Sequence, residues 1–166
     1  MSSPRALRVA VVTVSDGVVA GEREDASGGI IADWVRERGY DLAGRVEVPD
    51  ETGPISDAMM RLSDSGDCDL LLTTGGTGLT PRDVTPEATC AVLERAAPGI
   101  AEAIRADGLA KTPRAALGRG VAGVRGSTLI VNLPGSPKGV SDGLRVLSVV
   151  VEHAVDLVRG RFTSHD

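Results

Sequence analysis

Two short runs of branched apolar residues constrain the fold more than any other feature of the chain. They are Leu7–Val14 (LRVAVVTV) and Asp69–Thr74 (DLLLTT), and glycine-rich or polar segments follow both. A strand with one exposed face alternates apolar and polar residues, whereas these runs are apolar at successive positions. They therefore predict strands that are buried on both faces, which is typical of a parallel sheet.

Helical patterns alternate with the strands. We expect helices from a cap at Ser27 to Gly39, from Thr52 and Pro54, from a cap at Thr85, from Pro98 (a shorter one), and over Val140–Val158. Further strands are expected at Gly44–Val48 and in a hairpin of Gly120–Val124 and Ser127–Leu133, which turns at Arg125-Gly126. This order predicts βαβ units, and hence a three-layer α/β fold. Its sheet would be mostly parallel, with helices on both faces and a small antiparallel hairpin, in a single domain over residues 1–166.

The composition excludes several classes of function. Aromatic residues make up 2% of the chain and the net charge is −5, which suits neither base stacking nor contact with a nucleic-acid backbone. Two histidines and two well-separated cysteines give little from which to build a zinc site or a disulfide framework. No apolar run approaches the ~20 residues that span a bilayer, and the N-terminus has no signal-peptide pattern. We expect a cytoplasmic protein that binds neither nucleic acid nor membranes.

Four segments leave the predicted strands at their carboxyl ends. They are Ser15-Asp16, Pro49-Asp50, Gly75–Asp83 and Pro134–Lys138. Ligands of an open parallel sheet bind outside the carboxyl ends of the strands, so we expect these segments to gather along one edge. That edge would combine backbone amides, hydroxyl groups, carboxylates and a lysine, which suits an anionic small molecule.

The most informative of these segments lies in the run Thr73–Thr89 (TTGGTGLTPRDVTPEAT). Closely spaced glycines let a backbone turn sharply and present N–H groups to phosphate oxygens. A carboxylate beside phosphates needs a cation between them, so Asp83 is a candidate magnesium ligand. Arg82 could pair with a phosphate or hold the loop in shape.

Two other exits offer weaker signals. Asn132 and Ser136 can bond a base or a ribose and Lys138 can meet a phosphate, although Ser136 is equally suited to cap a helix. Ser15 and Asp16 offer a hydroxyl and an acceptor to a polar heterocycle, or else a local turn bond.

One motif is misleading. Gly118–Gly123 matches GxGxxG, but no convincing strand precedes it and a strand rather than a helix follows it. A dinucleotide fingerprint needs a strand before it and a helix after it. The chain also has no GxxxxGK[ST] phosphate loop, so an unrelated nucleotide-binding enzyme of the doubly wound type is disfavoured.

Four motifs, taken in order, resemble the MogA/MoaB family over nearly the whole chain. They are TVSD (Thr13–Asp16), DxSG (Asp25–Gly28), GGTG followed by RDVTPEA (Gly75–Ala88), and GVRGSTLIVNLPGSPKG (Gly123–Gly139). The resemblance implies a three-layer α/β fold and a role in molybdenum cofactor biosynthesis. It implies the transfer of AMP from MgATP to the terminal phosphate of molybdopterin, with release of pyrophosphate.

The resemblance also implies roles for particular residues. Asp50 and Asp83 correspond to the two acidic residues needed for turnover, and they would hold Mg²⁺. The implied molybdopterin-binding residues are Thr13, Ser15, Asp16, Gly75, Gly76, Thr77, Gly78, Arg82 and Thr128. The implied nucleotide-binding residues are Asp25, Ser27, Gly28, Asn132, Pro134, Gly135, Ser136 and Lys138.

The chain departs from the family pattern at Gly118, where relatives often have the serine of a Leu-Ser-Arg stretch. The missing hydroxyl leaves an alternative open, namely a non-catalytic molybdopterin carrier or scaffold of the MoaB type. The resemblance further implies a homo-oligomer, a trimer or in MoaB-like members a hexamer, and a MoeA-type protein as a partner.

Overall fold

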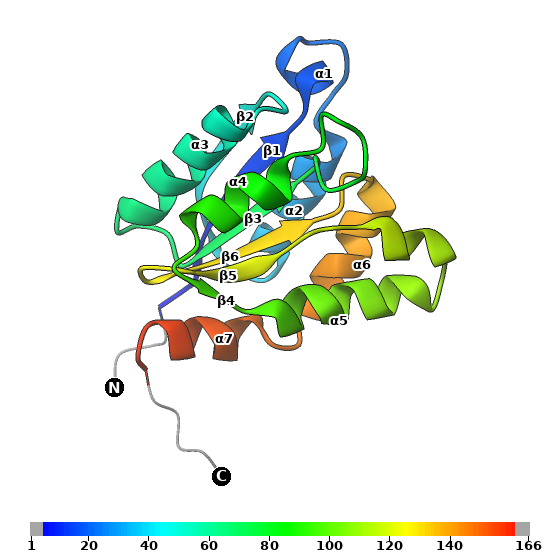
Figure 1. The fold of residues 1–166 in the computed structure, drawn as a ribbon. Coiled ribbons are helices and arrows are strands. Elements are labelled where there is room, and N and C mark those ends of the chain that lie inside the picture. Colours follow the sequence, from blue (N-terminus) through cyan, green and yellow to red (C-terminus); the bar gives the residue numbers. More distant parts are fainter. Residues whose placement is uncertain (1–4, 162–166) are drawn as a thin grey trace.

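The computed structural model describes residues 5–161, which build one six-stranded sheet with helices on both faces (Figure 1). The strands are β1 (Arg8–Val14), β2 (Asp41–Val48), β3 (Leu70–Thr74), β4 (Arg95–Ala96), β5 (Ala122–Arg125) and β6 (Thr128–Leu133). Their order across the sheet is β2-β1-β3-β6-β5-β4. The first four strands in this order are parallel, and β5 is antiparallel to both β6 and β4. The predicted mostly parallel α/β fold is confirmed.

Two hydrophobic layers hold the helices against the sheet. The helices are α1 (Asp16–Val19), α2 (Ala26–Glu37), α3 (Thr52–Asp64), α4 (Thr85–Val92), α5 (Pro98–Leu109), the 3₁₀ helix η1 (Pro113–Leu117), α6 (Pro137–Leu147) and α7 (Val151–Val158). Successive residues of β1 point to opposite faces, so Val9 and Val11 pack with α2, α5, α6 and α7, while Ala10 and Val12 pack with α3 and α4. Every residue of β1 and β3 is buried, as their apolar runs predicted. None of the helices within residues 5–161 is both long and apolar enough to cross a membrane.

The predicted antiparallel hairpin is present, one residue further along than expected. Arg125 pairs with Thr128, so the turn consists of Gly126 and Ser127, with Gly126 at φ +55°. β4 was not predicted. It lies along β5 where Gly123 has no side chain, and a Cβ at Gly123 would overlap the Arg95 carbonyl oxygen.

The structure corrects the expected ends of two helices. Asp25, not Ser27, caps α2, because an Asp25 carboxylate oxygen accepts a hydrogen bond from the Gly28 N–H at 2.9 Å. Thr85 is the first residue of α4 rather than its cap, and its hydroxyl donates to the Gly75 carbonyl at 2.9 Å. The hydroxyls of both Ser27 and Thr85 donate instead to main-chain carbonyls distant in sequence, those of Gly135 and Gly75, and sequence spacing does not reveal such partners.

Four other segments differ from expectation. The loop after β1 contains the short helix α1, and the irregular stretch after α5 contains η1. The helix from Pro98 has 12 residues and is longer than α4, which has 8. The final helix is broken into α6 and α7, where the Ser148 hydroxyl donates to the Leu144 carbonyl at 2.7 Å. Such back-bonding bends helices, and the β-branched residues that follow it are weak helix formers.

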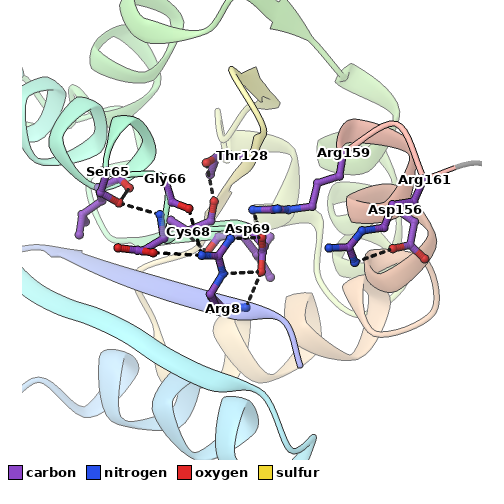
Figure 2. Close-up of polar contacts among 12 residues, drawn as sticks. Arg8, Ser65, Gly66, Cys68, Asp69, Thr128, Asp156, Arg159 and Arg161 are labelled. Carbon is purple, nitrogen blue, oxygen red and sulfur yellow. Dashed lines mark hydrogen bonds and ion pairs between the residues drawn. The ribbon is translucent and has the colours of Figure 1, made fainter. Parts of the chain in front are cut away.

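A polar cluster joins β1, β3 and α7 at the amino ends of the strands (Figure 2). Arg8 donates from Nε and Nη2 to the Asp69 carboxylate at 3.2 and 3.0 Å, and Arg159 pairs with the same carboxylate. Arg8 is 8% exposed and Asp69 4% exposed. A buried carboxylate with two arginine partners thus links the end of α7 to the sheet.

Candidate active site

A cavity of about 560 Å³ opens at the carboxyl ends of β1, β2, β3 and β6. The predicted site residues that line it are Thr13, Ser15, Asp25, Ser27, Asp50, Gly75, Gly76, Arg82, Asp83, Gly135 and Ser136. The four predicted exits therefore meet at one edge of the sheet. Gly76 and Ser136, 60 residues apart in sequence, face the same space, as the parallel-sheet argument required.

The glycine turn after β3 has a conformation that only glycine accommodates. Gly75 has φ +94° and Gly76 has φ +69°. A Cβ at Gly75 would overlap the Val14 carbonyl oxygen, and one at Gly76 would overlap the Thr85 hydroxyl. The turn thus brings its backbone against the end of β1, and leaves the cavity unobstructed at this point.

Asp16 and Asp50 join the exits of β1 and β2 by reciprocal hydrogen bonds. The Asp16 N–H donates to Asp50 Oδ2 at 2.8 Å, and the Asp50 N–H donates to Asp16 Oδ1 at 2.9 Å. Arg82 donates from Nε and Nη2 to Asp16 Oδ2 at 3.0 and 2.8 Å. The backbone hydrogen bond from Asp50, followed by that from Arg82, holds the pKa of the Asp16 carboxyl below its usual range. Arg82 therefore holds the loop in shape, which was one of its two predicted roles.

Asp50 and Asp83 each keep one carboxylate oxygen available to the cavity. Asp50 uses Oδ2 for the Asp16 N–H, and Asp83 uses Oδ2 for the N–H and hydroxyl of Thr80, at 2.9 and 2.8 Å. Within residues 5–161, neither Oδ1 accepts a hydrogen bond. Nor does the described chain contain a group of three His, Cys, Asp or Glu side chains placed to hold a metal ion. Asp50, Asp83 and Glu24 line the cavity, so a cation here would be held by fewer than three of these carboxylates and would complete its shell with water or substrate.

Both carboxylate oxygens of Asp25 accept hydrogen bonds from residues of the cavity wall and its surroundings. Its Oδ2 accepts hydrogen bonds from Thr13 Oγ1 at 2.7 Å and Arg45 Nη2 at 3.2 Å, while Oδ1 caps α2. A Cβ at Gly28 would overlap the Asp25 carboxylate, so this helix turn also needs glycine. The Ser27 hydroxyl donates to the Gly135 carbonyl at 2.7 Å and so joins α2 to the exit of β6.

A second cavity, of about 330 Å³, lies between β6, α5, η1 and α6. The predicted site residues that line it are Thr77, Asn132, Pro134, Ser136 and Lys138. Ser136 lines both cavities, so they are neighbours. The side-chain amide of Asn132 bonds to the Thr73 and Thr89 hydroxyls and to the Val121 N–H, so it is satisfied inside the protein.

Thr128 is not brought to the site. It begins β6, at the strand end opposite to the cavities, and it is fully buried. Its hydroxyl donates to the Cys68 carbonyl at 2.7 Å (Figure 2). It lines neither cavity. The Thr128 hydroxyl, which the resemblance assigned to molybdopterin binding, is therefore hydrogen-bonded inside the protein and lies away from both cavities.

The model of a family described as "Probable molybdopterin binding domain" matches residues 10–153. This chain belongs to the MogA/MoaB family. A molybdopterin adenylyltransferase from Helicobacter pylori (strain J99) is 37% identical over 161 residues, which cover 94% of this chain and 90% of that protein. The molybdopterin biosynthesis enzyme MoaB from Thermus thermophilus superposes with a TM-score of 0.87 at 49% identity, covering 93% of this chain and 97% of that one.

Membership also extends to longer proteins. The molybdenum cofactor synthesis protein cinnamon of Drosophila melanogaster is 39% identical over 150 residues. These cover 89% of this chain but 25% of that protein. In this MogA/MoaB relative the matching region is thus one part of a larger polypeptide.

Two arginines of this MogA/MoaB chain were missed by sequence reasoning. Arg23 lines the larger cavity and donates from Nη2 to Ser15 Oγ at 2.9 Å, and residues 5–161 hold no ion pair to it. A basic residue in a charge-rich loop gives no spacing signal. The side chain of Arg119 donates hydrogen bonds to main-chain carbonyls of the loop that follows the glycine turn. Its only signal was its place beside Gly118, where the chain departs from the family pattern.

Proposed function

We propose that this chain transfers the AMP group of ATP to the terminal phosphate of molybdopterin and releases pyrophosphate. The reaction would take place in the larger cavity. The observation that carries the proposal is the meeting of Asp50, Asp83, the glycine turn and Ser136 around one space. The adenylyltransferase name of the Helicobacter pylori relative, which this chain matches over most of its length, supports it.

In the proposed reaction the protein positions the two substrates, and it need not supply a nucleophile of its own. A phosphate oxygen of molybdopterin attacks the α-phosphorus of ATP, a new P–O bond forms, and the bond to the β-phosphate breaks as pyrophosphate leaves. Such transfers depend on alignment and on neutralising charge. Backbone amides at Gly75 and Gly76, the hydroxyls of Ser15 and Ser136, and the guanidinium of Arg23 are groups in the cavity wall that suit phosphate oxygens.

Asp50 and Asp83 are the residues that would hold Mg²⁺. Magnesium prefers oxygen ligands and is commonly bound by one or two carboxylates together with substrate phosphates. The Oδ1 atoms of Asp50 and Asp83, which accept no hydrogen bond within residues 5–161, fit this requirement. When bound, the ion would supply charge neutralisation at the triphosphate.

An Asp83→Asn variant tests the proposal directly. Asparagine keeps an acceptor for Thr80 but removes the negative charge, so the loop should survive while the cation is lost. We expect molybdopterin binding within about threefold of wild type, with pyrophosphate release slower by at least about 100-fold, as when one electrostatic contribution to a transition state is removed. Asp33→Asn, on the exposed face of α2, is the matched control and should turn over normally. Normal turnover by Asp83→Asn would refute the assigned role.

The second candidate is a carrier that binds molybdopterin without adenylylating it. Gly118 favours it, because it lines the smaller cavity without a side chain where family members often have serine. In that case the wild-type chain binds molybdopterin but releases no pyrophosphate from ATP, and Asp83→Asn behaves as wild type in every assay.

We propose a cytoplasmic homo-oligomer, a trimer in the first instance and a hexamer as the alternative, which passes its product to a MoeA-type protein. Light scattering of the purified chain distinguishes the two assemblies by mass. Co-purification with a MoeA-type protein tests the partner.

A further inference from the structure

Arg119 connects the walls of the two cavities. It lies between η1 and β5, beside Gly118 and Gly120, which line the smaller cavity. From there its side chain reaches the loop that carries Asp83. Nε donates to the Gly78 carbonyl at 2.8 Å and Nη2 donates to the Asp83 carbonyl at 2.7 Å. Its backbone N–H donates to the Thr77 carbonyl at 2.9 Å.

These contacts differ from an ordinary surface ion pair. Arg119 also pairs with Glu87 at 2.8 Å, but the side chains are 35% and 51% exposed, and a pair of that kind contributes little by itself. The bonds to two main-chain carbonyls are what fix the loop. The rigid guanidinium presents separate nitrogens to both carbonyls and to the carboxylate at once, whereas an ammonium group is a compact point charge on a flexible stem.

We propose that Arg119 is a positioning residue, which holds the loop of residues 77–83 so that the Asp83 carboxylate faces the larger cavity. This inference rests on the proposed function of Asp83. It adds a mechanical link, because the segment that borders the smaller cavity directly restrains the loop that borders the larger one. A carboxylate displaced by about 1 Å would lower the rate without removing any substrate contact.

The test compares Arg119→Ala and Arg119→Lys with Arg125→Ala. Arg125 is a matched control, since it too pairs with a carboxylate, that of Asp64, and donates to a main-chain carbonyl, that of Val92. It lines neither cavity. For Arg119→Ala we expect kcat about 100-fold lower, KM for ATP within about threefold of wild type, and half-saturation at higher Mg²⁺. Arg119→Lys should be intermediate, and Arg125→Ala should have kcat near wild type.

Hydrogen exchange of the ligand-free chain gives a readout that needs no turnover. Amides in residues 77–83 should exchange about tenfold faster in Arg119→Ala, the factor expected for losing one or two net hydrogen bonds, and at the wild-type rate in Arg125→Ala. Unchanged exchange, or equal losses of kcat in both alanine variants, would overturn the inference. If the wild type releases no pyrophosphate while this exchange difference is present, the proposed function fails and the positioning of the loop stands.

Discussion

Gly75 illustrates how strongly a single position can be constrained. Its φ of +94° disfavours any side chain, and a Cβ would also overlap the Val14 carbonyl oxygen. We expect Gly75→Ala to lower the free energy of unfolding by about 2–4 kcal/mol, from backbone strain and overlap together. Gly39→Ala, at φ +70° with open space around it, should cost only about 1–2 kcal/mol. Urea denaturation of both variants measures the difference, and equal losses would show that the close approach to Val14 contributes nothing.

For single residues, the sequence predicted where a side chain lies in the fold better than it predicted which groups that side chain contacts. Ser15, Asp50, Asp83 and Ser136 were placed correctly at the cavity because the exits of parallel strands must converge. The partner of a polar side chain depends instead on what the fold brings opposite it. Asp25 caps α2 through a local bond to the Gly28 N–H, but it also accepts hydrogen bonds from Thr13 and Arg45, which no local pattern could reveal.

At the level of elements, the polar cluster of Figure 2 should make stability depend on pH. Burial acts to raise the pKa of the Asp69 carboxyl, but the hydrogen bonds from Arg8 and the charge of Arg159 outweigh it and hold the pKa below its usual value. Since the folded pKa is the lower one, the contribution is complete above the unfolded pKa of about 3.9 and is lost as pH falls through the folded pKa.

Asp69→Asn should therefore destabilise the chain by about 3–5 kcal/mol at pH 7, because Arg8 and Arg159 lose their shared carboxylate. The gap to wild type should stay constant down to pH ~5 and narrow below pH ~4. Asp67→Asn is the control, since Asp67 also pairs with Arg8 but its side chain is 82% exposed, and it should change stability by less than about 1 kcal/mol. Urea titrations at several pH values give both comparisons. A gap that widens in acid would contradict the assigned sign.

Element types were predictable where the apolar pattern was clear, as in the continuous apolar runs of β1 and β3. Breaks were not, and caps were predictable only in part. Ser136 caps α6 as expected, its hydroxyl oxygen accepting a hydrogen bond from the Gly139 N–H at 3.1 Å, whereas Asp25 rather than Ser27 caps α2. The run from Val140 to Val158 has one helical period, yet the chain turns between Leu147 and Val151, because both halves must lie against the same face of a short sheet. β4 is 2 residues long and carries no periodic signal at all.

At the scale of the whole molecule, the net charge of −5 opposes the approach of the two anionic substrates that we propose. Binding must therefore depend on cations placed within the cavity. Arg23 and Arg82 are the arginines that line the larger cavity. Arg82 has its charge offset by Asp16, so of these two Arg23 is the one without an ion pair among the residues described. We expect Arg23→Gln to raise KM for ATP about tenfold, the loss typical of one charge-assisted hydrogen bond.

The control separates local charge from global charge. Arg36→Gln on α2, where Arg36 is 75% exposed and pairs with Asp33, changes the net charge from −5 to −6 as Arg23→Gln does. If the field of the whole molecule governed binding, the two variants would raise KM equally. Because charges further apart than a Debye length of about 10 Å are screened at 0.1 M salt, we expect only Arg23→Gln to do so. Steady-state kinetics at that salt concentration decide the matter, and a normal KM for Arg23→Gln would exclude this arginine from phosphate binding.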